Sequence, residues 1–302
     1  MKDYGRVAVL YGGPSSEREI SLKSGAAVVQ ALKSRGVDVH AIDVQPDIAT
    51  RLVAGNFKTV FLMLHGRLGE DGAIQGFLEV LGLPYTGSGI TASAIAMDKA
   101  LSKAVWVASG VPTPEYALID SPDGMATAAG RLGYPLIVKP VAEGSSIGIT
   151  KVRDARDLAR AYQLAADYGR VLAERCVTGA EYTCAILGGR ALPVIRLETP
   201  QDFYDYEAKY VLNTTRYHCP AGLAPDEERE VQTLALRAFQ ALGARGWGRV
   251  DLMRDADGRF YVLELNTAPG MTDHSLVPMA ARAAGLSFED LVLAILDHAG
   301  DA

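Results

Sequence analysis

Carboxylate, amide and guanidinium side chains lie two positions apart within residues 248–266, GRVDLMRDADGRFYVLELN. Two β-favouring runs flank the polar segment 255–258, so the stretch predicts a strand, a turn and a second strand. Side chains alternate between the two faces of a strand, and opposed residues of a hairpin share a face. The side chains expected on one common face are Arg249, Asp251, Glu264 and Asn266.

A four-residue turn at 255–258 would pair Asp251 with Val262 and Arg249 with Glu264. Mg²⁺ binds carboxylate and amide oxygens and keeps its remaining positions for water and phosphate oxygens. This face of the hairpin therefore favours a magnesium site. A solvated polar sheet face would explain the same residues, because one side of an antiparallel sheet commonly faces water.

Two lysines and a glycine-bearing loop could bind phosphate groups. Lys139 ends a short apolar strand just before the loop 143–148, EGSSIG, in which Gly144 and Gly148 allow close backbone approach. The loop matches neither GxxxxGK[ST] nor GxGxxG, so an ordinary turn is the alternative. Lys99 lies in an expected helix, where a single lysine is usually a surface residue.

The stretch 7–21, VAVLYGGPSSEREIS, has the strand, glycine loop and helix start that are typical of phosphate-binding loops. Ser16 and Glu19 have the spacing of a capping box, which predicts helix initiation. Glu17 would lie in the first helical turn, where the helix dipole favours a carboxylate. A carboxylate suits a cation, so this loop is a poor candidate for phosphate.

The elements that must position these residues alternate between strand and helix in the first part of the chain, which predicts a parallel sheet covered by helices. The strands expected there are 6–11, 37–44 and 59–64, and the helices are 17–35 and 72–81. Later helices are expected at 91–110, 155–168 and 225–243 and within 280–299. Later strands are expected at 135–140 and 149–152 and in a hairpin of 181–187 with 191–197. Residues 198–222 lack a regular period and predict a long loop, a feature that is usually functional or disordered; its aromatic residues argue against disorder.

Composition limits the classes of protein to which the chain could belong. Its 302 residues allow two or three domains, and 49% apolar and 22% charged residues are typical of a globular protein. A net charge of −6 argues against a nucleic-acid partner. No apolar run approaches the roughly 18–20 residues of a membrane span, and the run 7–11 is too short for a signal peptide. The three cysteines show no CxxC spacing, which predicts reduced thiols in the cytoplasm.

Eight motifs follow one another along the whole chain: GGPSSEREISL, LHGRLGEDGAIQG, GLPYTGSG, MDK, KPVAEGSSIG, FYDYEAKY, GWGRVDLM and LELNTAPGMTDHSLVPMAA. In this order they resemble the D-alanine–D-alanine ligase family of the ATP-grasp superfamily. The resemblance implies an α/β fold, α+β overall, with a Rossmann-like parallel-sheet domain at 1–87. It implies two α+β domains that clasp ATP, at 88–176 and 177–302, and a lid loop at 199–222.

The resemblance also implies roles for individual residues. Contacts to ATP would come from Lys99, Lys139, Glu143, Ser145, Ser146, Glu174, Arg175, Val177, Glu181 and Lys209. Two Mg²⁺ ions, for which Mn²⁺ could substitute, would be held by Asp251, Glu264 and Asn266. Arg175 stands where many relatives have lysine, and the two side chains are not geometrically equivalent.

The implied reaction joins two D-alanines for peptidoglycan precursor synthesis through an acyl phosphate. Glu17 would bind the ammonium group of the first D-alanine, near His65, although a histidine capping a strand end is the alternative. The donors to the tetrahedral oxyanion would be Arg249 and Gly270, and those to the second carboxylate would be Ser275 and Leu276. Tyr210 on the lid would join Glu17 and Ser145 in a hydrogen-bonded group, unless it simply packs there.

The resemblance further implies a cytoplasmic homodimer whose ligands are small molecules, without nucleic-acid or membrane partners. A ligase for another pair of D-amino or D-hydroxy acids is the main alternative. A nucleotide-binding module without catalysis is disfavoured, because degenerate members usually lose metal ligands and here all three are present together with Arg249.

Overall fold

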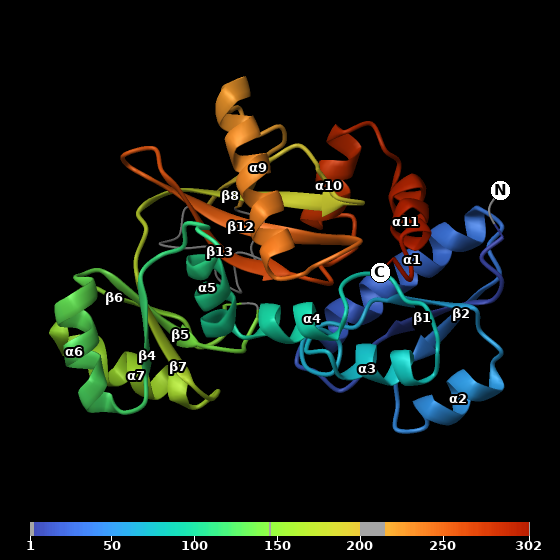
Figure 1. The fold of residues 1–302 in the computed structure, drawn as a ribbon, viewed down its shortest axis with the longest axis horizontal. Helices are drawn as coiled ribbons and strands as arrows, with labels where there is room; N and C mark the ends of the chain where they lie inside the picture. The colour runs from blue at the N-terminus through green and yellow to red at the C-terminus, as the bar shows by residue number, and fades with distance from the viewer. Residues whose placement is uncertain (1–2, 145, 200–214, 302) are drawn as a thin grey trace.

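The computed structural model describes residues 3–144, 146–199 and 215–301. Its strands form three sheets, one parallel and two antiparallel (Figure 1). The expectation of a mixed α/β fold is therefore confirmed. No described helix is long and apolar enough to cross a membrane.

The N-terminal sheet is parallel, as predicted, with strand order β2-β1-β3. Its strands are β1 (Val7–Tyr11), β2 (Val39–Asp43) and β3 (Thr59–Leu62), and its helices are α1 (Arg18–Ser34), α2 (Ile48–Ala54) and α3 (Ala73–Val80). The apolar run 7–10 is fully buried, as expected for a parallel strand covered on both faces. Because β1 and β3 are parallel neighbours, the loops that follow them leave the same edge of the sheet.

A second, antiparallel sheet has the order β4-β7-β5-β6. Its strands are β4 (Tyr116–Ile119), β5 (Leu136–Pro140), β6 (Thr150–Val152) and β7 (Val171–Arg175). Helices α6 (Pro122–Leu132) and α7 (Leu158–Ala166) bury their apolar sides against it, and a short 3₁₀ turn, η1 (Ala155–Asp157), precedes α7. This sheet carries Lys139 at the end of β5 and Glu174 on the neighbouring strand β7.

The third sheet has the order β11-β10-β8-β12-β13, with β9 paired to β8. Its strands are β8 (Gly179–Leu187), β9 (Arg190–Ala191), β10 (Ile195–Glu198), β11 (Arg216–His218), β12 (Trp247–Asp255) and β13 (Phe260–Asn266). The helices that follow in the chain are α9 (Pro225–Ala241), α10 (Leu276–Ala283) and α11 (Phe288–Asp297). Helix α9 packs on one face of this sheet through a core that contains Val231 and Phe239.

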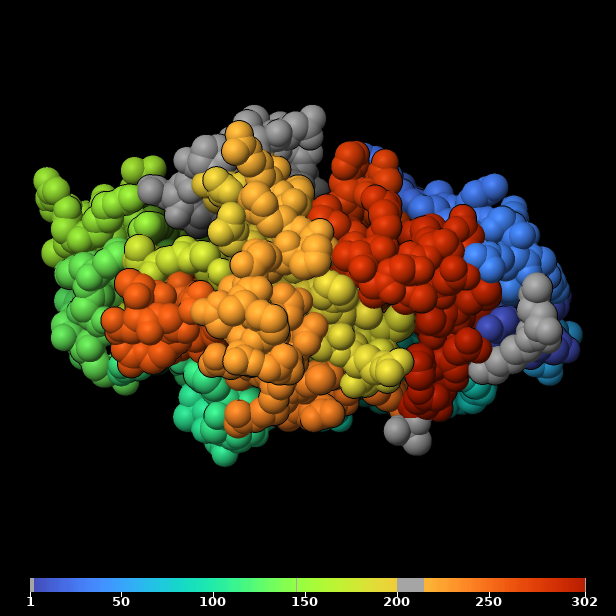
Figure 2. All heavy atoms as spheres, turned by 90° about the horizontal axis from the view of Figure 1, so that it is seen from above, coloured from blue at the N-terminus to red at the C-terminus, as the bar shows by residue number. Residues whose placement is uncertain are grey.

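The two ends of the chain share one hydrophobic core. Val28 and Leu32 of α1 belong to the same buried cluster as Leu291 and Ile295 of α11. Figure 2 shows the C-terminal helices, in red, seated against the N-terminal residues, in blue. This packing brings the loop after β1 toward the segment that follows β13.

Three local expectations were wrong. The helix expected at 91–110 is two helices, α4 (Ile90–Met97) and α5 (Lys99–Ala108), because Asp98 is extended and its carboxylate accepts a hydrogen bond from the Leu101 N–H at 2.9 Å. Part of the expected loop 198–222 is strand β11, which pairs with β10. The expected Ser16–Glu19 capping box is absent, since α1 begins at Arg18 and has no side-chain cap.

The register expected for the β12–β13 hairpin was also wrong. Asp251 lies opposite Glu264 rather than Val262, and Arg249 lies opposite Asn266. The turn has three residues, 256–258, because the Asp255 N–H bonds to the Arg259 carbonyl, and this shifts the register by one residue. A bulge beside Asp251 then shifts the register by a second residue. Two one-residue shifts leave the faces unchanged, so the expectation that the four polar residues share a face is confirmed.

Candidate active site

The polar face of the β12–β13 hairpin is organised around Asp251, which is buried. Its carboxylate accepts hydrogen bonds from Arg249 Nε at 2.8 Å and Nη2 at 2.7 Å, and from Asn266 Nδ2 at 3.1 Å. Thr183, opposite Asp251 on β8, donates to it at 2.6 Å. Thr183 was not predicted from the sequence, because only the pairing of β8 with β12 brings it to this face.

Lys99 connects this face to the glycine loop. As the first residue of α5 it is only 8% exposed, so the surface alternative was wrong. Its ammonium group lies 3.4 Å from Glu264 Oε2 and donates to the Glu143 carbonyl at 2.6 Å. The backbone N–H of Lys99 bonds to the Val141 carbonyl at 3.0 Å, which holds the start of α5 against the end of β5.

A second buried cluster lies beside these groups. Lys139 Nζ donates to Glu174 Oε1 at 2.5 Å, and Lys103 Nζ lies 2.9 Å from Glu174 Oε2. Burial raises the pKa of Glu174, but the two ammonium groups outweigh it and leave that pKa below its usual value. Burial lowers the pKa of Lys103 to about 8, against the opposing effect of Glu174. Lys103 was not predicted from the sequence, although its position four residues after Lys99 in MDKALSK places both on one side of a helix.

The other residues expected to contact adenine and ribose lie where β7 passes into β8. Arg175 ends β7, and its guanidinium lies 5.5 Å from the centre of the Tyr261 ring. Val177 lies two residues after Arg175, and Glu181 lies near the start of β8. All three therefore lie on or next to the β7–β8 connection, close in sequence to Glu174.

Glu17 lies between two glycine loops. A Cβ on Gly66 would lie 3.0 Å from Glu17 Oε2, and a Cβ on Gly144 would lie 3.3 Å from Oε1. Ser15 joins the loops after β1 and β3, because its hydroxyl donates to the His65 carbonyl at 2.7 Å and accepts from the Glu17 N–H at 3.2 Å. The parallel sheet thus brings Glu17 and His65 together, as the expected roles require.

The loop that carries Glu17 is fixed by a charged pair. Arg18 donates to both oxygens of Asp43, at 2.8 and 2.6 Å, and to the Gly13 carbonyl at 3.0 Å. These hydrogen bonds lower the pKa of Asp43 to about 2. Gly12 has φ +74°, and a Cβ there would lie 2.1 Å from Asp43 Oδ1, so this turn requires glycine.

His65 and Glu70 lie close enough to Glu17 for its carboxylate charge to act on both of them. His65 is 5% exposed, and its Nε2 has no hydrogen-bond partner among the described residues. Burial lowers the pKa of His65, although Glu17 acts in the opposite direction. Burial and Glu17 raise the pKa of Glu70 to about 8.

Glu70 was missed from the sequence, although it lies in the quoted motif LGEDG. It accepts hydrogen bonds from the backbone N–H groups of Gly66 at 2.7 Å and Ala268 at 3.2 Å. It therefore joins the loop after β3 to the segment after β13.

The segment after β13 reaches the N-terminal helix. Met271 N–H donates to Ser24 Oγ of α1 at 3.0 Å, and Ser275, the N-cap of α10, has its hydroxyl 2.9 Å from the Thr272 N–H. A Cβ on Gly270 would lie 3.0 Å from Ser275 Oγ. Leu276 is the first residue of α10. Ser145, Lys209 and Tyr210 lie outside the described residues, so the expected Glu17–Ser145–Tyr210 group stays a prediction.

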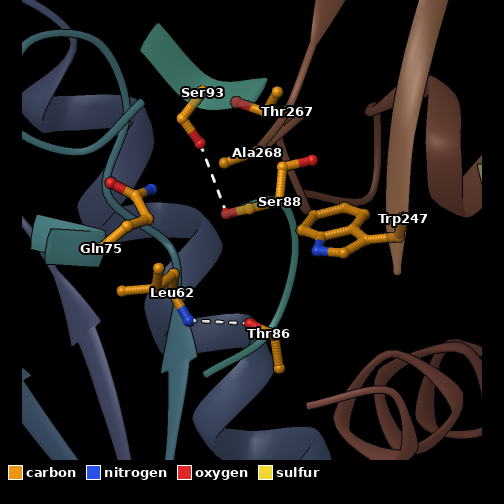
Figure 3. A pocket seen from close by; sticks show the side chains of 8 residues that line it. All are labelled: Leu62, Gln75, Thr86, Ser88, Ser93, Trp247, Thr267 and Ala268. Carbon is orange, nitrogen blue, oxygen red and sulfur yellow. Dashed lines mark hydrogen bonds between the residues drawn. The ribbon is translucent and has the colours of Figure 1, made fainter. Parts of the chain in front are cut away.

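A small cavity lies between the first and third sheets, next to the segment after β13. It encloses about 10 Å³ and is lined by Leu62, Gln75, Thr86, Ser88, Ser93, Trp247, Thr267 and Ala268 (Figure 3). That volume suits about one water molecule and excludes a substrate. None of the residues predicted from the sequence lines it.

Comparison with known proteins gives consistent matches along the chain. A family model described as the D-ala D-ala ligase C-terminus matches residues 105–297, and the corresponding N-terminus model matches 6–51 and 48–88. The D-alanine–D-alanine ligase of Pseudomonas putida (strain GB-1) is 58% identical over 297 residues, which cover 98% of this chain and 93% of that protein.

Solved structures agree with these matches. A D-alanine–D-alanine ligase from Bacillus anthracis complexed with ATP superimposes with a TM-score of 0.83 at 31% identity, over 97% of this chain and 96% of that one. The VanG D-Ala:D-Ser ligase from Enterococcus faecalis gives a TM-score of 0.85 at 29% identity, over 97% and 98%. The fold is thus shared by ligases with different second substrates.

Proposed function

Since the chain belongs to the D-alanine–D-alanine ligase family, we propose that the clusters around Asp251, Glu174 and Glu17 catalyse its reaction. The family has the ATP-grasp fold and joins two D-alanines, with ATP, for peptidoglycan synthesis. One observation carries the assignment of sites: the Lys99 ammonium group lies between Glu264 of the hairpin face and the Glu143 carbonyl of the glycine loop. A buried cation at that junction is suited to triphosphate.

ATP would lie between the second and third sheets. Lys99 and Lys139 would bind its phosphates, and the loop 143–148, with Ser145 and Ser146, would cover them. Its adenine and ribose would contact Glu174, Arg175, Val177 and Glu181. The burial of both lysines supports these roles, because a buried ammonium group interacts more strongly with phosphate than an exposed one does.

The hairpin face has a donor set that fits Mg²⁺. Asp251 and Glu264 are directly opposed, and Asn266 reaches Asp251, so two carboxylates and an amide converge. Glu264 already faces a cation, the Lys99 ammonium group. Two bound Mg²⁺ ions, or Mn²⁺, would neutralise charge on the phosphates. The bidentate contact with Arg249 orients the Asp251 carboxylate for this purpose.

The first D-alanine would bind by its ammonium group to Glu17, next to His65. Its carboxylate attacks the γ-phosphorus of ATP, which forms an acyl phosphate and releases ADP. Arg249 and the Gly270 N–H would donate to the oxyanion of the later tetrahedral intermediate, a contribution of about 3–4 kcal/mol for each such donor.

The second D-alanine would bind by its carboxylate to the Ser275 hydroxyl and the Leu276 N–H at the start of α10, a suitable position for an anion. Its neutral amine attacks the acyl carbon, and phosphate then leaves. Lys209 and Tyr210 would cover the intermediate as parts of the 199–222 lid, which excludes water.

Three further expectations belong to this proposal. The domains would be 1–87, 88–176 and 177–302, boundaries that fall between the three sheets. The protein would act as a homodimer. A cytoplasmic location is supported by the free thiols of all three cysteines.

An assay of phosphate release tests the function. With ATP and Mg²⁺, release should require D-alanine and should not occur with L-alanine. D-serine and D-lactate should be poor partners for D-alanine. Equal activity with L-alanine would overturn the assignment, and faster release with D-alanine plus D-serine than with D-alanine alone would favour the specificity named for the Enterococcus neighbour.

A further inference from the structure

Two lysines converge on one buried carboxylate in the candidate ATP site. The side chains of Lys103, Glu174 and Lys139 are 0%, 4% and 7% exposed. Each ammonium group contacts a different oxygen of Glu174, at 2.9 Å for Lys103 and 2.5 Å for Lys139. One lysine would be enough to neutralise the carboxylate, so with both protonated the cluster carries an excess positive charge.

The two lysines differ in how firmly they are held. Lys103 donates to Thr113 Oγ1 at 2.7 Å, and that hydroxyl donates to the Val262 carbonyl of β13 at 2.8 Å. The Lys103 ammonium group also lies 5.8 Å from the centre of the Tyr116 ring, a cation–π contact. Lys103 is therefore fixed to both neighbouring sheets. Lys139 instead lies at the end of β5, directly before the residues that lead to the 143–148 loop.

This difference determines what happens when Lys139 binds a phosphate. A buried carboxylate that loses its only cation is strongly destabilised. With Lys103 in place, Glu174 keeps a counter-ion while Lys139 turns toward phosphate. Without Lys103, Glu174 and the phosphate would compete for the same ammonium group.

We propose that Lys103 is a positioning residue that serves as the permanent counter-ion of Glu174 and so releases Lys139 to bind the phosphates of ATP. The inference rests on the proposed function, because it takes Lys139 as a phosphate-binding residue. It differs from a purely structural role, in which Lys103 would only hold α5 against β13 through Thr113. The structural role predicts equal losses for every ligand of the site.

The test compares ATP with adenosine, which has no phosphate. Both dissociation constants are measured by calorimetry on the full chain with excess Mg²⁺, and the ratio of adenosine Kd to ATP Kd reports the phosphate contribution. In Lys103→Met this ratio should fall about tenfold or more, with the adenosine Kd nearly unchanged. Parallel losses for ATP and adenosine would overturn the proposal in favour of the structural role.

A rescue experiment sharpens the result. In the double variant Lys103→Met/Glu174→Gln no carboxylate competes for Lys139, so the ratio should return to that of Glu174→Gln alone. A ratio as low as that of Lys103→Met would overturn the proposal. Thermal unfolding of each variant checks folding. If Lys103→Met does not fold, Glu174→Gln still provides a test, because its ratio should equal or exceed the wild-type ratio, and a fall would refute the inference.

The same data separate this inference from the proposed function. Wild-type protein that binds ATP no more tightly than adenosine would contradict the phosphate site itself. A high wild-type ratio that Lys103→Met leaves unchanged would contradict only the role of Lys103.

Discussion

Substitution of Gly144 by alanine should weaken binding at the proposed site of the first D-alanine without disturbing the fold. A Cβ at this position would lie 3.3 Å from Oε1, 3.4 Å from Oε2 and 3.5 Å from Cδ of Glu17. Gly144 does not have a positive φ, so alanine adopts its backbone without strain. The added methyl group therefore acts almost entirely on the Glu17 carboxylate, which must move by a few tenths of an ångström.

The size of the effect follows from the contact that Glu17 is proposed to make. A hydrogen bond to a charged group contributes about 1.5–3 kcal/mol, and loss of half of a contact at the upper end of that range is about 1.5 kcal/mol. That corresponds to about a tenfold rise in KM for the first D-alanine. The free energy of unfolding should stay within about 0.5 kcal/mol.

Phosphate release measured against D-alanine concentration and fitted to a two-site rate law gives the two KM values. Gly130→Ala is the matched control, because a Cβ on this glycine of α6 meets nothing within 4 Å and should leave all KM values unchanged. Gly66→Ala should raise the KM for D-alanine, because the new Cβ would lie 3.0 Å from Glu17 Oε2. It should also lower the free energy of unfolding, because φ +67° disfavours alanine. An unchanged KM for D-alanine in Gly144→Ala would refute the placement of Glu17.

Three further changes have definite outcomes. The pKa of Asp43 is about 2 in the folded chain, below its ordinary value of 3.8, so its contribution to stability is present above pH 4 and is lost as the pH falls toward 2. Asp43→Asn should therefore remove about 1 kcal/mol at pH 7 and little at pH 2, as urea unfolding at each pH would report. Trp106→Phe should cost about 1–3 kcal/mol in the same assay, because the indole N–H donates to the buried Ala238 carbonyl at 2.9 Å. Asp251→Asn should raise the Mg²⁺ concentration needed for half-maximal phosphate release by about tenfold or more, as a titration with MgCl₂ would show.

The sequence alone determined which side chains could do chemistry and where most elements lie. The parallel N-terminal sheet followed from the alternation of strands and helices, and the motifs identified the ligase family. The expectation that Arg249, Asp251, Glu264 and Asn266 share a face depended only on a period of two, which is a local property of a strand.

The register of the β12–β13 hairpin could not be predicted from the local sequence pattern. The three-residue turn alone would have directed Glu264 and Asn266 toward the buried face. The bulge beside Asp251 adds a second one-residue shift, which returns both side chains to the polar face. The burial of the side chains agrees with the bulge. Leu263 and Glu264 are adjacent and both only partly buried, whereas Val262 and Leu265 on either side are buried.

Tertiary structure decided the partners that are distant in sequence. Glu174 pairs with Lys103 only because β7 and α5 are packed together, and Glu70 reaches Ala268 only because the first sheet lies against the segment after β13. Each side chain is compatible with many surroundings, so its type and spacing reveal the chemistry it can do. The pKa of a side chain and the partner it contacts depend on how it is buried. That burial is produced by residues elsewhere in the chain, which only the packed fold brings next to it.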